Sequence, residues 1–208
     1  MILLQEMDFL TVIFEIFVVI FSVVLHEVSH GAVANSMGDS TAKDLGRLTL
    51  NPFKHLDLFG SIILPIFTFL LGGFVFGYAK PVPYNPLNLR DRKYGPVKVA
   101  LAGPAVNLVI AVLFGMMLRF LPFSLQATAL PGLLKFIVML NLVLAIFNLM
   151  PIPPLDGHWL LFTFLPDKFV KFKMFLMQYS LIIFFVFLIF VFPLLFPLIN
   201  FLFNAIVG

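Results

Sequence analysis

Residues 16–30 read IFVVIFSVVLHEVSH, an apolar run that ends in the H-E-x-x-H pattern of His26, Glu27 and His30. The apolar part is typical of a membrane-spanning helix, where a charged side chain costs about 3 kcal/mol unless it is paired or ligated. Positions i and i+4 share one face of a helix, so the two imidazoles can reach one metal ion. Glu27 lies about 100° around the helix from His26, near enough to hold a water bound to that ion. The alternative, two polar core histidines beside an unrelated carboxylate, would leave a costly buried cluster without a partner.

The composition indicates a polytopic membrane protein. Of the 208 residues, 62% are hydrophobic and 11% are charged, and the mean hydropathy is +1.10. We expect one membrane-embedded domain over residues 1–208, because no polar segment is long enough to form a second one. Cysteine is absent, so any metal must be held by histidine and carboxylate. The basic residues are few and are not interleaved with stacking aromatic residues, so we expect no nucleic-acid partner. The N-terminal segment lacks a basic region and carries Glu6, Asp8 and Glu15, so we expect no cleaved signal peptide.

The pattern of apolar runs predicts an all-α polytopic membrane protein with about four transmembrane helices, a re-entrant apolar segment and a short β-like hairpin. The four spans are predicted over residues 8–37, 97–121, 130–150 and 172–204. The re-entrant segment is residues 58–76, which Pro65 interrupts, and the hairpin is placed at residues 46–50, which alternate like a short strand. Residues 79–96 are rich in proline and asparagine, which favours an extended path over a helix.

The distribution of charge predicts which side of the membrane each loop occupies. If residues 58–76 enter and leave on one side, eleven of the 13 basic residues share that side, and only Arg119 and Lys135 lie on the other. The positive-inside rule then places the eleven in the cytoplasm and both termini outside. If residues 58–76 instead span the membrane, Asp156 emerges about 30 Å from the two histidines. We therefore prefer the re-entrant interpretation.

A zinc ion held by two histidines needs a third protein ligand and an open position for water. Five aspartates lie in polar loops with basic residues, where we expect solvated surface charges: Asp39, Asp44, Asp57, Asp91 and Asp167. Asp156 differs, because it follows an apolar helix and the break NLMPIPPLDG, residues 148–157. The prolines and Gly157 should let the carboxylate turn back into the bundle. We predict Asp156 as the third ligand; the alternative is an aspartate that caps a helix.

The chain resembles the site-2 proteases, which are zinc metalloproteases that cleave peptide bonds within membranes. The resemblance rests on H-E-V-S-H and N-L-M-P-I-P-P-L-D-G, with support from G-R-L-T-L-N-P, A-K-P-V-P-Y-N-P and A-G-P-A-V-N, and it covers residues 9–160. The chain looks like the compact prokaryotic members, since it has room for neither a PDZ nor a CBS domain. The resemblance implies His26, His30 and Asp156 as ligands of one zinc ion and Glu27 as the catalytic base.

The resemblance also implies that Asn107 and Asn148 line the cleft. In the expected chemistry, zinc lowers the pKa of a bound water towards about 7. Glu27 takes the proton and passes it to the leaving amine. An amide from Asn107 or Asn148 would donate to the oxyanion. The alternative for each asparagine is an interhelical hydrogen bond that only packs the bundle. We expect His158 not to ligate the metal and His55 to lie on a surface loop.

The sequence therefore predicts an intramembrane zinc endopeptidase that hydrolyses peptide bonds within or near transmembrane segments of membrane proteins. We expect the protein to lie in a prokaryotic cell membrane, with its active site opening towards the cytoplasm. Its expected partners are the lipid bilayer and a transmembrane protein or peptide substrate, which must unwind locally before cleavage. One alternative is a membrane transporter or channel that binds a divalent metal ion, and another is a non-catalytic scaffold that keeps a metal site. A transporter does not need a glutamate at the position of Glu27, and the complete H-E-x-x-H pattern with an aspartate argues against a scaffold. Trp159 is expected to anchor the chain at the membrane interface.

Overall fold

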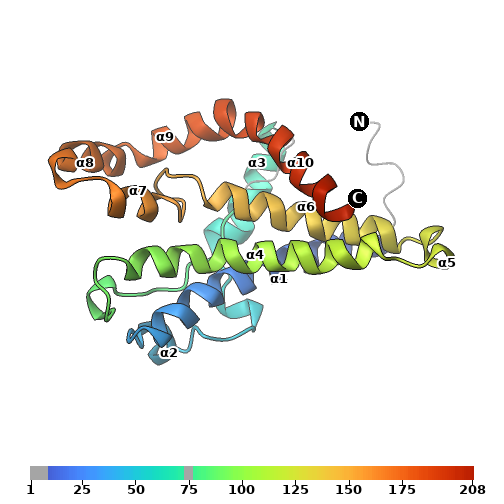
Figure 1. Ribbon diagram of the computed structural model, residues 1–208, viewed down its shortest axis with the longest axis horizontal. Helices are drawn as coiled ribbons and strands as arrows, with labels where there is room; N and C mark the ends of the chain where they lie inside the picture. Colours follow the sequence, from blue (N-terminus) through green and yellow to red (C-terminus); the bar gives the residue numbers. More distant parts are fainter. Residues whose placement is uncertain (1–8, 73–76) are drawn as a thin grey trace.

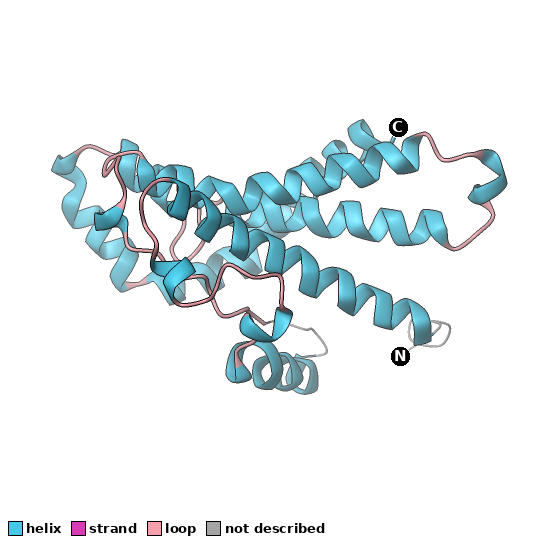
Figure 2. Ribbon diagram, turned by 90° about the horizontal axis from the view of Figure 1, so that it is seen from below, coloured by secondary structure: helices cyan, strands magenta, loops and turns pink. Residues whose placement is uncertain are grey.

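The computed structural model describes residues 9–72 and 77–208. Within these residues the chain forms helices, turns and loops, and no β-strand (Figure 2). Four helical segments are long and apolar enough to cross a membrane: Phe9–Ser36, Gly95–Arg119, Leu130–Asn148 and Ser180–Val207. They correspond to the four expected spans, so the prediction of an all-α integral membrane protein is confirmed. Glu6 and Asp8, where the first span was expected to begin, lie outside the described residues.

The helices follow one another along the whole chain (Figure 1). The α-helices are α1 (Phe9–Ser36), α2 (Thr41–Asp44), α3 (Leu64–Gly72), α4 (Gly95–Arg119), α5 (Phe123–Gln126), α6 (Leu130–Asn148), α7 (His158–Phe164), α8 (Val170–Gln178), α9 (Ser180–Val186) and α10 (Phe196–Val207). A π-helical turn (Phe59–Ile63) precedes α3, and another (Phe187–Val191) followed by a 3-10 turn (Phe192–Leu195) joins α9 to α10. This irregular stretch contains Pro193 and is followed by Pro197, and proline interrupts the hydrogen bonds of a regular helix.

The centre of the molecule is a bundle in which α4 packs against both α1 and α6 (Figure 1). Fully buried side chains from three helices meet in its core: Ala111 of α4, Val138 and Leu142 of α6, and Ile199 of α10. Helices in a membrane are held together by close packing rather than by a hydrophobic driving force, so small residues at the contacts matter. At Gly115 of α4, an added Cβ would collide with Ile206 of α10. The small residues therefore set how closely these helices approach.

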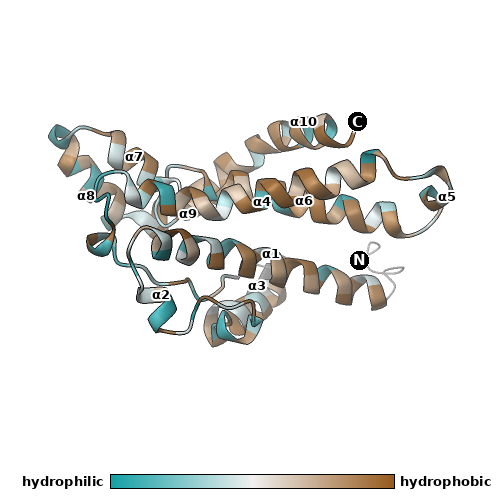
Figure 3. Cartoon of the chain, turned by 60° about the horizontal axis from the view of Figure 1, so that its bottom comes forward, coloured by the Kyte–Doolittle hydropathy of each residue, from teal (hydrophilic) through white to brown (hydrophobic). Residues whose placement is uncertain are grey.

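The outer faces of the long helices remain apolar, whereas hydrophilic residues gather at the end that holds α2, α7 and α8 (Figure 3). Large apolar side chains such as Phe17, Leu113 and Phe190 are more than half exposed. An exposed apolar surface of this extent is typical of a protein surrounded by lipid. We therefore expect the end that holds α2, α7 and α8 to meet water.

The two ends of the apolar segment that contains α3 are tied together. The N–H of Tyr78 donates to the carbonyl of Gly60 at 3.0 Å, and the hydroxyl of Ser61 donates to the carbonyl of Tyr78 at 2.9 Å. The chain that enters this segment therefore lies directly beside the chain that leaves it. Residues 73–76, the expected end of the apolar run, lie outside the described residues.

The expected β-like hairpin is wrong. Residues 46–50 pass from a turn into an irregular bend, and the N–H of Arg47 donates back to the carbonyl of Ala42 at 2.8 Å, which closes the end of α2. Gly46 has φ of +63°, a left-handed conformation that suits glycine at a helix end and not a strand. The apolar residues of this stretch do not alternate because of a strand: the side chain of Leu48 packs on α1.

Asp39 was expected to be a solvated surface charge, and this expectation is wrong. Its side chain is fully buried beyond the end of α1. Its carboxylate accepts hydrogen bonds from the N–H of Asn85 at 2.6 Å, the Nδ2 of Asn88 at 3.0 Å and the hydroxyl of Thr41 at 2.5 Å. Burial alone would raise the pKa of Asp39, but these hydrogen bonds outweigh burial and lower the pKa. The carboxylate therefore attaches the extended segment to α1.

His55 was also expected on the surface, but its side chain is only 1% exposed. Its Nε2 donates to the carbonyl of Thr49 at 2.8 Å, and its own carbonyl accepts from the N–H of Lys80 at 2.9 Å. The polar loop that carries His55 is covered by the extended segment, a contact between residues far apart in sequence. His55 thus helps to hold that segment in place.

Candidate metal centre

Three predicted ligands meet in the bundle. His26 and His30 lie on the inner face of α1, and Asp156 lies in the loop between α6 and α7, 130 residues from His26. The Oδ2 of Asp156 is 3.1 Å from the Nε2 of His26 and 3.2 Å from the Nε2 of His30. The two histidines are buried, and Asp156 is partly exposed. These residues therefore offer three donor atoms to one point, as H-E-x-x-H and the proline-rich break predict.

The spacing of these atoms fits a zinc ion. In a tetrahedral site with ligand distances of about 2.0–2.1 Å, neighbouring donor atoms lie about 3.3 Å apart, close to the two measured distances. The Nε2 of His30 is buried and makes no hydrogen bond of good geometry, so it retains a lone pair for a ligand. An added Cβ at Gly103 of α4 would lie 2.5 Å from the Nε2 of both His26 and His30. Gly103 therefore keeps free the space that an ion would occupy.

Each imidazole is held from behind by α4. The Nδ1 of His30 donates to the carbonyl of Val99 at 2.7 Å, and the Nδ1 of His26 lies 2.6 Å from the Oδ1 of Asn107. A histidine whose Nδ1–H is bound in this way presents its Nε2 lone pair to a metal. Both rings are thus oriented before any ion binds.

Asn107, expected to line the cleft, is fully buried behind His26. Its Nδ2 donates to the Oδ1 of Asn141 at 2.8 Å and approaches the carbonyl of Ser22 at 3.5 Å. The amide hydrogens of Asn107 therefore point into the bundle and are committed there. This arrangement does not leave them free to donate to a substrate oxyanion.

The loop that carries Asp156 is folded against the end of α6. The N–H of Gly157 donates to the carbonyl of Asn148 at 2.7 Å, and a Cβ at Gly157 would collide with the carbonyl of Leu149. Leu155 is buried against aromatic side chains of the last span. Glycine is thus required for a close approach between two pieces of backbone, and this approach positions the neighbouring carboxylate.

The environment of Asp156 favours its charged form. Burial would raise the pKa of Asp156, but the hydrogen bonds and charges of His26 and His30 outweigh burial and lower the pKa to about 2. The side chain of His158 points away, and its Nδ1 donates to the carbonyl of Leu155 at 2.7 Å. Burial lowers the pKa of His158, which keeps its ring neutral. Asp156 is therefore an ionised carboxylate beside two imidazoles.

Glu27 faces a small cavity of about 100 Å³ next to the three ligands. Its carboxylate accepts a hydrogen bond of 2.8 Å from the backbone N–H of Val82 in the extended segment. The cavity is lined by Glu27, His30, Pro81, Val82, Tyr84, Ala100, Asp156 and Trp159. A carboxylate and two of the candidate ligands therefore share one water-sized space.

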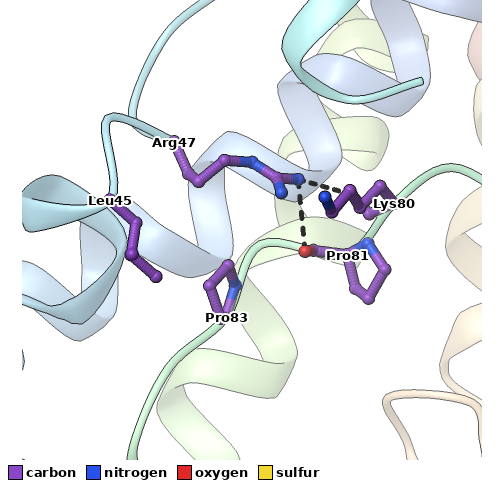
Figure 4. Close-up of a pocket in the computed structure, with 5 residues that line it drawn as sticks. All are labelled: Leu45, Arg47, Lys80, Pro81 and Pro83. Carbon is purple, nitrogen blue, oxygen red and sulfur yellow. Dashed lines mark hydrogen bonds between the residues drawn. The ribbon is translucent and has the colours of Figure 1, made fainter. Parts of the chain in front are cut away.

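A larger cavity of about 400 Å³ lies on the other side of the extended segment, and none of the candidate ligands lines it. Figure 4 shows its lining residues, Leu45, Arg47, Lys80, Pro81 and Pro83. One guanidinium nitrogen of Arg47 donates to the carbonyls of Lys80 at 2.8 Å and Pro81 at 3.3 Å (Figure 4). Arg47 thus fixes the stretch of backbone that leads to the N–H bound by Glu27. The smaller cavity is the candidate site, because the carboxylate of Glu27 and two candidate metal ligands line it.

Several residues of the site were missed by the sequence interpretation. Val82, Tyr84 and Trp159 line the small cavity, and the rings of Tyr84 and Trp159 pack with centroids 6.4 Å apart. A single sequence does not show which residues of the A-K-P-V-P-Y-N-P segment face α1. Ser22 and Asn141 did carry a signal, since each is a polar residue inside an apolar span, where such residues usually have a partner or a function.

Comparisons with known proteins point to one family. The family model of Peptidase family M50 matches residues 14–129 and 124–191. "Putative zinc metalloprotease YwhC" of Bacillus subtilis is 38% identical over 192 residues, which are 87% of this chain and 83% of that protein. "Putative zinc metalloprotease Rip2" of Mycolicibacterium smegmatis is 36% identical over 138 residues, which are 66% of this chain and 51% of that protein. "Putative zinc metalloprotease MJ0611" of Methanocaldococcus jannaschii is 48% identical over 62 residues, which are 29% of this chain and 30% of that protein. No solved structure matches the chain.

The family match extends over most of the chain and includes both halves of the candidate site, from α1 to the loop after α6. The match to the Bacillus subtilis protein covers more than four fifths of both proteins. The donor atoms and their spacing agree with the metal that the names of these relatives state. The chain therefore belongs to peptidase family M50, the site-2 protease family, and is a membrane-embedded zinc metalloprotease.

Proposed function

We propose that this protein is an intramembrane endopeptidase, formed by the whole chain as one domain, that cuts peptide bonds within or near transmembrane segments of other membrane proteins. The observation that carries this proposal is the cluster of His26, His30 and Asp156 beside a small cavity that Glu27 lines together with His30 and Asp156. Three protein ligands leave a fourth position on a zinc ion for water or substrate, and a carboxylate beside that position is what hydrolysis needs. We propose His26, His30 and Asp156 as the ligands and Glu27 as the general base.

The residues of the site divide the chemistry among them. Bound zinc would polarise the carbonyl of the scissile bond and lower the pKa of a water towards about 7. The carboxylate of Glu27 takes a proton from the attacking water and later gives it to the leaving nitrogen. The N–H of Val82 holds one oxygen of this carboxylate, which leaves the other oxygen for the proton.

The oxyanion of the reaction needs a hydrogen-bond donor besides the metal, and we propose Tyr84 and Asn148 for this role. The hydroxyl of Tyr84 is buried beside the cavity, and although the indole of Trp159 approaches it, it makes no hydrogen bond of good geometry. Burial raises the pKa of Tyr84, so the hydroxyl keeps its proton. One amide hydrogen of Asn148 is bound to the carbonyl of Leu144 at 3.0 Å, which leaves the second hydrogen available.

We also propose that the apolar segment around α3 re-enters the membrane and leaves on the cytoplasmic side, where the cleft opens to a prokaryotic cytoplasm. The hydrogen bond between Tyr78 and Gly60 supports this proposal, because it brings the two ends of the segment together. The helical stretch Phe59–Gly72 is about 20 Å long, which is shorter than the 30 Å hydrocarbon core. On this path eleven of the 13 basic residues share the cytoplasmic side, as the positive-inside rule requires.

A cleavage assay tests the proposed function directly. The purified protein is placed in lipid vesicles with a panel of single-span substrates, with zinc, after chelation, and after zinc is restored. We expect cleavage within the span that stops with the chelator and returns with zinc. Substrates whose scissile region contains Gly or Asn should be cut faster than an all-Leu span, because cleavage needs an extended backbone.

The variant Glu27→Gln separates a protease from a metal transporter. It should bind zinc like the native protein but lose about 10²–10⁴-fold in cleavage rate, the usual contribution of a general base. Glu15→Gln makes the same change of charge three turns earlier on α1 and should keep native activity. Cleavage by Glu27→Gln at a near-native rate, or metal transport without any cleavage, would overturn the proposal.

A further inference from the structure

A chain of three polar side chains runs behind His26, away from the cavity. It joins three different spans: Ser22 of α1, Asn107 of α4 and Asn141 of α6, of which the two asparagines are fully buried and Ser22 is 4% exposed. Polar groups inside a membrane protein must find partners, and these find one another. Hydrogen bonds between spans average about 0.6 kcal/mol, so helix packing alone is a weak reason to bury two amides.

The hydrogen bonds among these three side chains fix which end of each amide faces its neighbour. The Nδ2 of Asn141 donates to the carbonyl of Ile137 at 2.9 Å and to the Oγ of Ser22 at 3.0 Å. Its Oδ1 is therefore the end that meets the Nδ2 of Asn107, at 2.8 Å. This contact turns the Oδ1 of Asn107 towards the Nδ1 of His26, 2.6 Å away. An amide oxygen only accepts, so the Nδ1 of His26 carries the hydrogen.

We propose that Asn141 and Ser22 are positioning residues for the metal centre. They hold the amide of Asn107 in the orientation that keeps a hydrogen on the Nδ1 of His26, so that the Nε2, which lies 3.1 Å from the Oδ2 of Asp156, is the atom left to bind metal. With Asn107 reversed, its NH₂ group would face the Nδ1 of His26, and the ring hydrogen would move to the Nε2 and block the ligand position.

The second histidine does not depend on such an arrangement. The Nδ1 of His30 is bound by the carbonyl of Val99, and a backbone carbonyl has no reversed orientation. His26 is bound instead by an amide side chain that can rotate, and Asn141 and Ser22 supply the contacts that prevent its rotation. The inference rests on the proposed ligand set, because it assumes that the Nε2 of His26 binds the metal.

The test uses the full-length protein in lipid nanodiscs and measures two quantities. The first is zinc affinity, by competition with a chelator, and the second is whether the Nδ1 of His26 carries a hydrogen in the metal-free protein, by ¹⁵N NMR with assignment against His26→Gln. Asn141→Leu should lower zinc affinity by about 10–100-fold, the usual effect of removing a residue that supports a ligand. It should also give His26 a mixture of tautomers. Ser22→Ala, which is a milder change, should shift both quantities in the same direction by a smaller amount.

Val138→Ala is the matched control, because Val138 is fully buried on α6 but lies outside the polar chain. It should destabilise the bundle and leave zinc affinity and the tautomer unchanged. Native affinity with only the Nδ1–H form of His26 in both Asn141→Leu and Ser22→Ala would overturn the inference. His30→Ala tests the proposed ligand set separately. If it keeps full zinc affinity, the ligand set fails, and the tautomer in the metal-free protein still decides the role of Asn141.

Discussion

The backbone N–H of Val82 and the carboxylate of Glu27 form a 2.8 Å hydrogen bond across 55 residues of sequence. The proposed base is thus oriented by main chain from the extended segment, and not by a side chain of its own helix. Arg47 holds the carbonyls of Lys80 and Pro81 from the opposite side, so this stretch of backbone is fixed on both faces. The position of the base therefore depends on residues that carry no catalytic chemistry themselves.

Replacing Val82 by proline removes this donor, because proline has no N–H. A hydrogen bond to a charged group contributes about 1.5–3 kcal/mol. We therefore expect the Val82→Pro variant to cleave its substrate about 10–100-fold more slowly than the native protein and to keep its zinc. Val82→Ala shortens the same side chain but keeps the N–H, and it should retain most of the activity. Equal rates for the proline and alanine variants, measured by the initial rate of substrate cleavage, would show that this bond does not orient the base.

Adding one methyl group at Gly103 should empty the metal centre. The new Cβ would lie 2.5 Å from the Nε2 of both His26 and His30, in the space that an ion needs. We expect Gly103→Ala to fold but to contain little zinc by elemental analysis. Gly132→Ala adds the same methyl group to α6 where no atom lies within 4 Å, and it should keep about one zinc per chain. A full complement of zinc in Gly103→Ala would place the metal elsewhere.

Asp39→Asn should destabilise the protein at neutral pH, because the buried carboxylate accepts hydrogen bonds from Asn85, Asn88 and Thr41. A loss of about 1–3 kcal/mol is expected, and each kcal/mol lowers the melting temperature by about 2–4 °C. The pKa of Asp39 is lowered in the folded state, so its contribution is present above the unfolded value of about 3.9 and disappears as the pH falls through the folded pKa.

Thermal unfolding of both proteins in detergent, at pH values from 7 downwards, measures this difference. The difference in melting temperature between the native protein and Asp39→Asn should become smaller only at acid pH. Asp44→Asn, a nearby exposed aspartate, is the control and should change the melting temperature little. If the full difference in melting temperature is still present at pH 2, the charge of Asp39 does not cause it.

The re-entrant path of the segment around α3 can be tested by labelling, because the native chain has no cysteine. A single cysteine at Asn51 and one at Leu87 should react with an impermeant reagent from the same side of sealed vesicles. Gln126→Cys, in α5 between two spans, should react from the other side. Labelling of positions 51 and 87 from opposite sides would mean that the segment spans the membrane.

The spans and the pairing of the two histidines of the candidate metal centre could be predicted from the sequence, because both depend on local patterns. Apolar length decides a span, and the i, i+4 spacing brings His26 and His30 to one side of a helix. The burial of Asp39 and His55 could not be predicted, because both are covered by the extended segment, whose position depends on contacts across the chain. The orientation of Asn107 could not be predicted either, because only its partners on two other helices fix which end of the amide faces His26.

The hydrogen bond between Tyr78 and Gly60 brings the two ends of the apolar segment together and makes the segment a loop with a fixed base. The entropy of closing such a loop changes slowly with its length, by about 0.6 kcal/mol for each doubling. Residues can therefore be added or removed within the loop while its base stays fixed and the backbone next to Glu27 keeps its place. On the re-entrant path that we propose, the depth to which this segment reaches into the lipid is thus free to adapt to bilayers of different thickness, independently of the site that it adjoins.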